Sequence, residues 1–227
     1  MRKAIKILGL FDLLVVVFYV GYFALNAPTI VKAVENKLSP IKDSYNTTNA
    51  VADIIKLPTA SASSDDNNGS ASKQNSEVVE FKAKFKNDWL YYPKLGIEAP
   101  VEWDVQTQNV KKLLVNELVH ISGTGKPDTS GEALIAGHSS YYWWSDGKYK
   151  NIFAPLVKSA ESDYIIVKVK DRVYIYAVKD SKQVSSSTEL EMKVGSTSQK
   201  KLFLLTCVPI GTNLKRLIVE ADLVREI

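Results

Sequence analysis

The sequence predicts an all-β domain, a β-barrel or sandwich with one or two short helices, behind an N-terminal transmembrane helix. Three observations predict this architecture. A 19-residue apolar run lies near the N-terminus, a polar segment follows later, and in residues 78–227 short strand-like runs alternate with Gly, Pro, Asp and Ser. The 227 residues suffice for one domain with additional segments or for two small domains.

The apolar run Ile7–Leu25 contains one charged residue, Asp12. As a helix it would span roughly 28 Å, close to the thickness of a bilayer core. The preceding basic residues are Arg2, Lys3 and Lys6. By the positive-inside rule, we expect the N-terminus in the cytoplasm and the rest of the chain outside the cell membrane. A cleaved signal peptide and a buried soluble helix are the alternatives.

Three regions are expected along the chain: residues 1–27 as cytoplasmic tip and anchor, 28–77 as extracytoplasmic stalk and linker, and 78–227 as the folded domain. Residues 28–58 have modest helical periodicity interrupted by prolines. Thr59–Glu77 has no aromatic and no large aliphatic residue, so it predicts a flexible tether.

Seven short apolar runs predict strands: Trp89–Tyr92, Ala99–Val101, Ala133–Ala136, Tyr164–Val169, Val173–Val178, Lys201–Thr206 and Leu217–Val224. The fourth and fifth runs flank Lys170-Asp171-Arg172 and predict a hairpin. Helical patterns are limited to Val110–Leu118 and Ile152–Val157. This pattern favours a barrel or a sandwich.

Composition excludes several classes of site. Residues 78–227 contain 21 basic and 18 acidic residues, a balance too even to indicate a nucleic-acid surface. One cysteine excludes an intrachain disulfide framework and a Cys-cluster metal site, and there are two histidines. We therefore expect no metal or organic cofactor and no nucleic-acid partner.

Cys207 ends the apolar run KLFLLTC and precedes a loop that contains Pro209 and Gly211. A lone cysteine is more often an inert buried side chain. Outside the cell an idle thiol is oxidised, so an unpaired cysteine there indicates a reactive group. A thiol with a pKa of about 8.5 needs a nearby base or cation to react at neutral pH, and a histidine supplies either.

His138, in EALIAGHSS, also ends an apolar run, and His120, in ELVHISGTGKPD, is the competing histidine. A structural role is the ordinary alternative for each. Arg216 begins the strand after the cysteine loop, where its guanidinium suits an oxyanion or a substrate carbonyl, with a surface ion pair as the alternative. The run Tyr141–Trp144 either lines a substrate groove or packs on the barrel, and packing is the favoured interpretation.

The segment LFLLTCVPIGTNLKRLIV resembles the signature of the sortase family, in which an apolar strand ends in Thr-Cys and a loop leads to an arginine. EALIAGHSS resembles the family's catalytic-histidine segment, and LYYPKLGIEAPV resembles its opening strand pair. The resemblance covers most of residues 88–227. It implies an eight-stranded barrel and a cysteine transpeptidase.

By this resemblance His138 takes the place of the catalytic histidine, Cys207 of the nucleophile and Arg216 of the arginine. Thr206 precedes the nucleophile, and Thr206 and His120 are expected at most to contribute to substrate or oxyanion binding. Sortases are bacterial surface enzymes that act on secreted proteins with a C-terminal sorting signal and on an amine acceptor, from peptidoglycan or a pilin lysine. A membrane location, with the domain outside, agrees with the topology predicted from Ile7–Leu25.

The cysteine loop is similar to that of pilin-polymerising sortases. Those enzymes commonly carry a second membrane segment and a lid with an Asp-Pro-aromatic motif, whereas Asp88-Trp89 lacks the proline. The subclass is therefore left open. Two further functions stay open on the residues alone: a tethered β-barrel binding module with an incidental cysteine, and a hydrolytic cysteine peptidase on the same fold.

Overall fold

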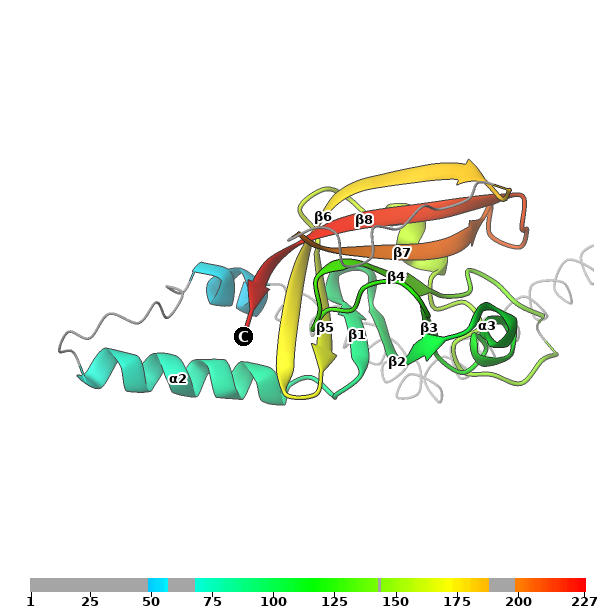
Figure 1. Cartoon of the computed structure of the whole chain (residues 1–227). Coiled ribbons are helices and arrows are strands. Elements are labelled where there is room, and N and C mark those ends of the chain that lie inside the picture. The colour runs from blue at the N-terminus through cyan, green and yellow to red at the C-terminus, as the bar shows by residue number, and fades with distance from the viewer. Residues whose placement is uncertain (1–48, 57–67, 143, 188–198) are drawn as a thin grey trace, which may run out of the picture. The chain divides into compact units, whose positions relative to one another are not determined.

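The computed structural model describes residues 49–56, 68–142, 144–187 and 199–227, which lie within one compact unit, Ser44–Ile227. The eight strands of these residues form a closed barrel in the order β1-β2-β3-β4-β7-β8-β6-β5 (Figure 1). Their bounds are β1 Trp89–Tyr92, β2 Ile97–Val105, β3 Leu118–Ile121, β4 Gly131–Ala136, β5 Tyr164–Val169, β6 Arg172–Ser185, β7 Lys200–Val208 and β8 Lys215–Glu226. The predicted all-β class with few short helices is confirmed.

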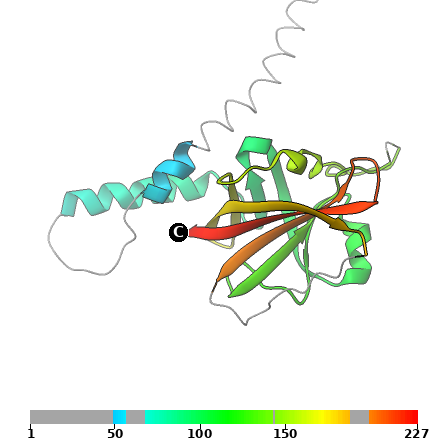
Figure 2. The same ribbon diagram turned by 90° about the horizontal axis from the view of Figure 1, so that it is seen from above.

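All seven predicted strands are present, and β1 and β5 have the predicted bounds. The predicted hairpin is β5 paired with β6, antiparallel. Strand β8 lies between β6 and β7 (Figure 2). Two strand pairs are parallel, β2 with β3 and β4 with β7, and the second of these positions the candidate site.

The helical prediction over Val110–Leu118 is wrong at its C-terminal end. Helix α3 spans Thr107–Leu113, and the missed strand β3 begins at Leu118. Because Leu118 is fully buried and pairs with Val101 of β2, tertiary contacts give this segment its extended form. The second helical prediction corresponds to the short 3-10 helix η2, Ala154–Lys158, and a further one, η1, spans Pro93–Leu95.

The barrel interior is filled by alternate residues of the strands. In β4, β7 and β8, the strands that carry the candidate site residues or lead to them, the inward-facing residues are Ala133 and Ile135 of β4, Leu202, Leu204 and Val208 of β7, and Leu217, Val219 and Ala221 of β8. Successive side chains of a strand point to opposite faces. The intervening residues, such as Ala136 and Leu205, therefore lie on the outer face, where they join a second apolar cluster with α3 residues.

Two helices precede the barrel: one lies partly in the predicted tether, Thr59–Glu77, and differs from it, and the other lies in residues 28–58, where the sequence has helical periodicity. Helix α2 spans Asn68–Ala83, and residues 49–56 are also helical. Val51 and Ile54 are buried in a cluster with Phe81 and Phe85, against strands β1, β5 and β6. The Lys168 ammonium of β5 also donates to the carbonyl oxygens of Lys82 and Phe85, at 3.1 and 3.0 Å. The apolar residues beyond Glu77 therefore give α2 a surface to bury, and its helix extends back into the polar segment.

The predicted anchor, Ile7–Leu25, lies outside the described residues. Among the residues that are described, none of the helices has the length and apolar character needed to span a bilayer.

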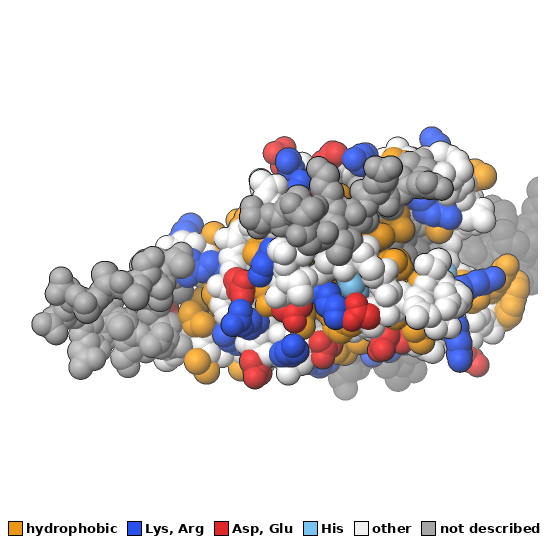
Figure 3. All heavy atoms as spheres, in the orientation of Figure 1, with side chains coloured by type: hydrophobic (Ala, Val, Ile, Leu, Met, Phe, Trp, Pro, Cys, Tyr) orange, Lys and Arg blue, Asp and Glu red, His pale blue; other side chains and the backbone are white. Residues whose placement is uncertain are grey.

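Charges of both signs are interspersed on the barrel surface. On the face shown in Figure 3, basic and acidic side chains alternate. Among the described ion pairs, Lys201 is paired with Glu220 at 2.5 Å and lies 3.7 Å from Asp222. Because positive and negative side chains are mixed, this surface does not form a field of one sign that would attract a polyanion such as a nucleic acid.

Candidate active site

The register of three strands places the predicted site residues in one row. Strand β4 pairs with β7 with Ala136 beside Leu205, and the backbone N–H of Gly137 donates to the Leu205 carbonyl at 3.1 Å. Continuing this register by two residues brings His138 beside Cys207. On the other side of β7, Arg216 is the direct partner of Cys207 in β8. Neighbouring strands lie about 4.8 Å apart, so His138 and Arg216 each lie one strand spacing from Cys207, on opposite sides of it.

All three side chains lie on the outer face of the barrel. Cys207 lies two residues after Leu205, and His138 lies two residues after Ala136, so each shares the outward direction of those residues. Cys207, His138 and Arg216 are all half-buried, hence accessible but not fully solvated. An outward, half-buried thiol beside an imidazole and a guanidinium has the arrangement that nucleophilic catalysis requires.

The backbone that carries His138 is held by buried contacts. The hydroxyl of Thr206 donates to the Gly137 carbonyl at 2.8 Å, which ties the end of β4 to β7. The backbone N–H of Phe153 donates to the His138 carbonyl at 2.9 Å. Thr206 is 2% exposed, so its side chain supports this backbone on the side opposite Cys207, away from the expected substrate or oxyanion position.

Gly137 allows Phe153 to approach the β4 terminus. A Cβ at this position would lie 2.5 Å from a ring carbon of Phe153 and 2.7 Å from a methyl carbon of Leu118. Both neighbours are fully buried and cannot move aside freely. The glycine therefore fixes how closely the backbone before His138 sits on the core.

Gly137→Ala is expected to destabilise the fold by about 1–3 kcal/mol, because it overpacks this contact. Denaturant unfolding measures the loss. In the double variant Gly137→Ala/Phe153→Leu the smaller side chain relieves the clash, so the combined loss should be less than the sum of the single losses. Strict additivity would show that the two residues do not compete for the same space.

Burial lowers the pKa of His138, because the apolar surroundings disfavour the imidazolium form. Its Nε2 atom is buried and has no hydrogen-bond partner among the described residues. The ring is in contact with Tyr141 at a centroid distance of 4.8 Å. A neutral imidazole with an unsatisfied nitrogen is suited to exchange a proton with a substrate.

The cysteine loop is joined to the histidine segment by one hydrogen bond. The backbone N–H of Gly211 donates to the Ser140 hydroxyl at 3.0 Å. Within the loop, Arg216 donates from Nη1 to the carbonyl oxygens of Asn213 and Lys215, at 3.1 and 3.2 Å. These contacts hold the guanidinium at the beginning of β8. The sequence gives no signal for the Ser140 contact, which depends on how two distant loops meet.

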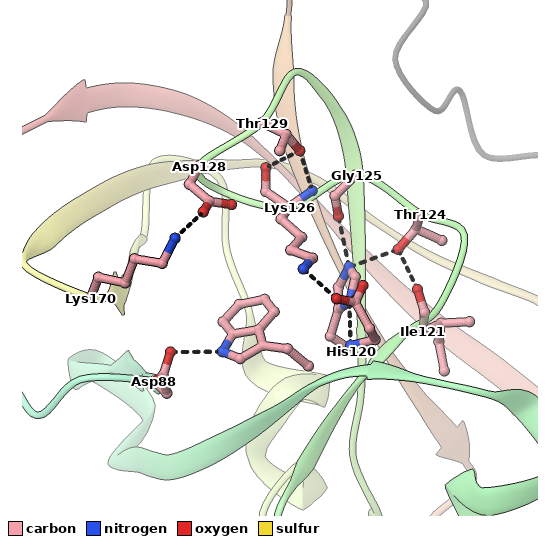
Figure 4. A network of polar contacts seen from close by, with 11 residues as sticks. Asp88, His120, Ile121, Thr124, Gly125, Lys126, Asp128, Thr129 and Lys170 are labelled. Atoms are coloured by element: carbon pink, nitrogen blue, oxygen red, sulfur yellow. Dashed lines mark hydrogen bonds and ion pairs between the residues drawn. The ribbon is translucent and has the colours of Figure 1, made fainter.

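His120 does not belong to this row: it lies on β3, in a network of polar contacts with the β3–β4 loop (Figure 4). It is 0% exposed, and its Nδ1 accepts a hydrogen bond from the Asp104 backbone N–H at 3.2 Å. Its Nε2 is 2.7 Å from the Gly125 carbonyl and 3.0 Å from the Thr124 hydroxyl. Burial lowers the pKa of His120 as well. With both nitrogens occupied, this histidine organises the β3–β4 loop, and the expected role in the substrate groove has no support here.

The aromatic run after the histidine is only partly packed. Tyr141 is half-buried, whereas Tyr142 and Trp144 are 59% and 65% exposed, and Trp143 lies outside the described residues. Packing on the barrel, favoured from the sequence, is therefore wrong for Tyr142 and Trp144.

Comparison with known proteins agrees with this fold. A family model for the sortase domain matches residues 90–224. Sortase C1 from Streptococcus agalactiae is 22% identical, over 68% of this chain and 77% of its own, with a TM-score of 0.50. Sortase C1 from Streptococcus suis is 19% identical, over 78% and 94%, with a TM-score of 0.51. A lid mutant of sortase A from Corynebacterium diphtheriae is 21% identical, over 86% and 95%, with a TM-score of 0.50.

A search of curated proteins finds no match to this chain. At identities near 20%, the three solved structures show a shared fold. The family model covers more than half of the chain and spans the barrel from β1 to β8. The chain therefore belongs to the sortase family, whose members are cysteine transpeptidases.

Proposed function

We propose that this sortase is a membrane-anchored enzyme that cleaves a C-terminal sorting motif of secreted proteins and transfers the new carboxyl end to an amine. The acceptor amine belongs to peptidoglycan or to a pilin lysine. The observation that carries the proposal is the row of His138, Cys207 and Arg216 across β4, β7 and β8, in which a nucleophile, an acid–base group and a cation share one face.

In the first half of the cycle, the Cys207 thiolate attacks the carbonyl carbon of the scissile peptide bond. The new S–C bond produces a tetrahedral oxyanion, which Arg216 and backbone N–H groups near Cys207 stabilise. The C–N bond then breaks, and the His138 imidazolium donates its proton to the leaving amine. The products are a thioester on Cys207 and a neutral His138.

In the second half, an acceptor amine attacks the thioester carbon. Neutral His138, the form that burial favours, accepts the proton from the attacking nitrogen. The S–C bond breaks and returns the Cys207 thiolate beside an imidazolium. Water is the slower competitor for the same thioester. No third residue is required to orient the histidine through a hydrogen bond.

The test incubates the full chain with a library of sorting-motif peptides, with and without an added amine, and analyses the products by mass spectrometry. An amine-dependent conjugate, absent with Cys207→Ala, is the expected result. Hydrolysis products alone would indicate a peptidase on the same fold. Absence of turnover together with no labelling of Cys207 by a thiol-directed probe would indicate a binding module with an incidental cysteine.

The membrane part of the proposal rests on Ile7–Leu25 and the basic residues before it. External protease added to intact cells is expected to cut between the predicted anchor and the barrel and to release a soluble fragment that contains residues 78–227. An N-terminal tag should stay protected until the cells are permeabilised. Protection of the whole chain would contradict the proposed orientation.

A further inference from the structure

Within the described part of the chain, no hydrogen-bonding group fixes the orientation of the His138 ring. Its Nε2 has no partner among the described residues, and the carbonyl contact to Phe153 involves the backbone alone. The terminal torsion of a histidine is broad and roughly two-fold, so an unconstrained imidazole samples several orientations. Proton transfer needs the ring nitrogen within hydrogen-bond reach of the reacting groups. Some other contact must therefore limit the rotation of this ring.

Tyr141 makes that contact. Its ring lies 4.8 Å from the His138 ring, centroid to centroid, with an angle of 33° between the planes. This is a tilted arrangement, so rotation of the imidazole out of its present plane would bring it toward the tyrosine ring. Aromatic pairs at such distances have a preferred mutual orientation.

Tyr141 is itself held in place by its neighbours. The Tyr142 ring meets it edge-on at 5.2 Å, and Trp144 stacks on Tyr142 at 4.9 Å with an interplanar angle of 20°. The Lys150 ammonium donates to the Ser145 carbonyl at 2.6 Å, and this hydrogen bond restrains the turn that follows Trp144. The hydrogen bond from Gly211 to Ser140 fixes the backbone just before Tyr141. The half-buried Tyr141 is thus the inner member of a series of three described rings.

We propose that Tyr141 is the positioning residue for His138, and that its ring contact orients the imidazole toward Cys207 in place of a hydrogen-bonding carboxylate. The inference rests on the proposed function, since it assigns His138 as the acid–base group. The electron-rich face of the tyrosine favours the imidazolium form, which opposes the effect of burial on the pKa of His138. The other ionisable groups that share the row are Cys207 on β7 and Arg216 on β8.

The test compares three variants of the full chain. Tyr141→Phe keeps the ring and should retain kcat within about 2-fold of the parent. Tyr141→Leu removes the ring and should lower kcat on the order of 10-fold or more with little change in KM, since misplacement of a catalytic group reduces the rate rather than binding. The ring of Tyr142 meets that of Tyr141, whereas the ring contact of His138 is with Tyr141, so Tyr142→Leu should lower kcat less than Tyr141→Leu.

Two measurements need no substrate and separate this inference from the proposed function. One is the pH profile of Cys207 alkylation, and the other is an NMR titration of the two histidines. Tyr141→Leu should shift the titration of His138 and the alkylation profile, while His120 stays unchanged. These shifts would support the contact even if no transpeptidation substrate were found. Unchanged His138 titration, a loss confined to KM, or failure of Tyr141→Phe to retain kcat would overturn the proposal.

Discussion

Cys207→Ala and His138→Ala are each expected to reduce transpeptidation by 10³-fold or more, about the loss seen for members of a catalytic unit. Cys207→Ala removes the atom that forms the thioester. His138→Ala removes the proton donor for the leaving amine and the ion partner of the thiolate. Product formation from a sorting-motif peptide and an amine measures both losses. Because the two groups act as a unit, the double variant should be scarcely worse than either single variant.

His120→Ala is the matched control, since it changes the other histidine of the chain. It leaves the buried Gly125 carbonyl and the part-buried Asp104 N–H without their His120 partner, which should cost about 1–3 kcal/mol of folding stability. Activity per folded molecule should stay near that of the parent. An active His138→Ala together with an inactive, folded His120→Ala would show that the wrong histidine had been assigned.

The strands that the sequence predicts are those whose apolar character is local. Tyr164–Val169 is apolar along most of its length and ends at a polar turn, so its bounds are readable without tertiary information. Strand β3, LVHI, is shorter and follows a helical pattern with no Gly or Pro between them, and only its neighbours β2 and β4 determine its form. The second half of β6 is polar, so the sequence pattern does not predict a strand there, although residues Asp180 to Ser185 pair with β8.

The site shows a similar division. Cys207, His138 and Arg216 are marked in the sequence by residue type and by position at strand ends, and the register then explains their proximity. The sequence does not indicate in which direction the side chains of the neighbouring residues point. Thr206 adjoins the cysteine but points inward, and Tyr141 becomes informative only when its ring is seen beside His138. Contacts across loops depend on tertiary structure, which local patterns do not encode.

Arg216→Lys is expected to lower kcat by roughly 10²-fold while the barrel stays folded. The residue is the second of β8 and lies directly opposite Cys207, and its hydrogen bonds to the Asn213 and Lys215 carbonyls come from Nη1 alone. Among the described residues, Nε and Nη2 have no partner, so these nitrogens are available to two oxygens in one plane. A planar guanidinium can bind an oxyanion and a neighbouring carbonyl together, whereas an ammonium is a compact point charge with a different reach.

The size of the effect follows from the loss of one oriented oxyanion donor, which typically costs about 3 kcal/mol. Arg216→Ala should be at least as impaired as Arg216→Lys. Cys207 should still react with a small alkylating agent in both variants, because alkylation requires the thiolate but no oxyanion stabilisation. The informative experiment measures turnover and alkylation on the same preparation. If alkylation falls together with turnover, Arg216 acts by stabilising the Cys207 thiolate, and the oxyanion role assigned to it is wrong.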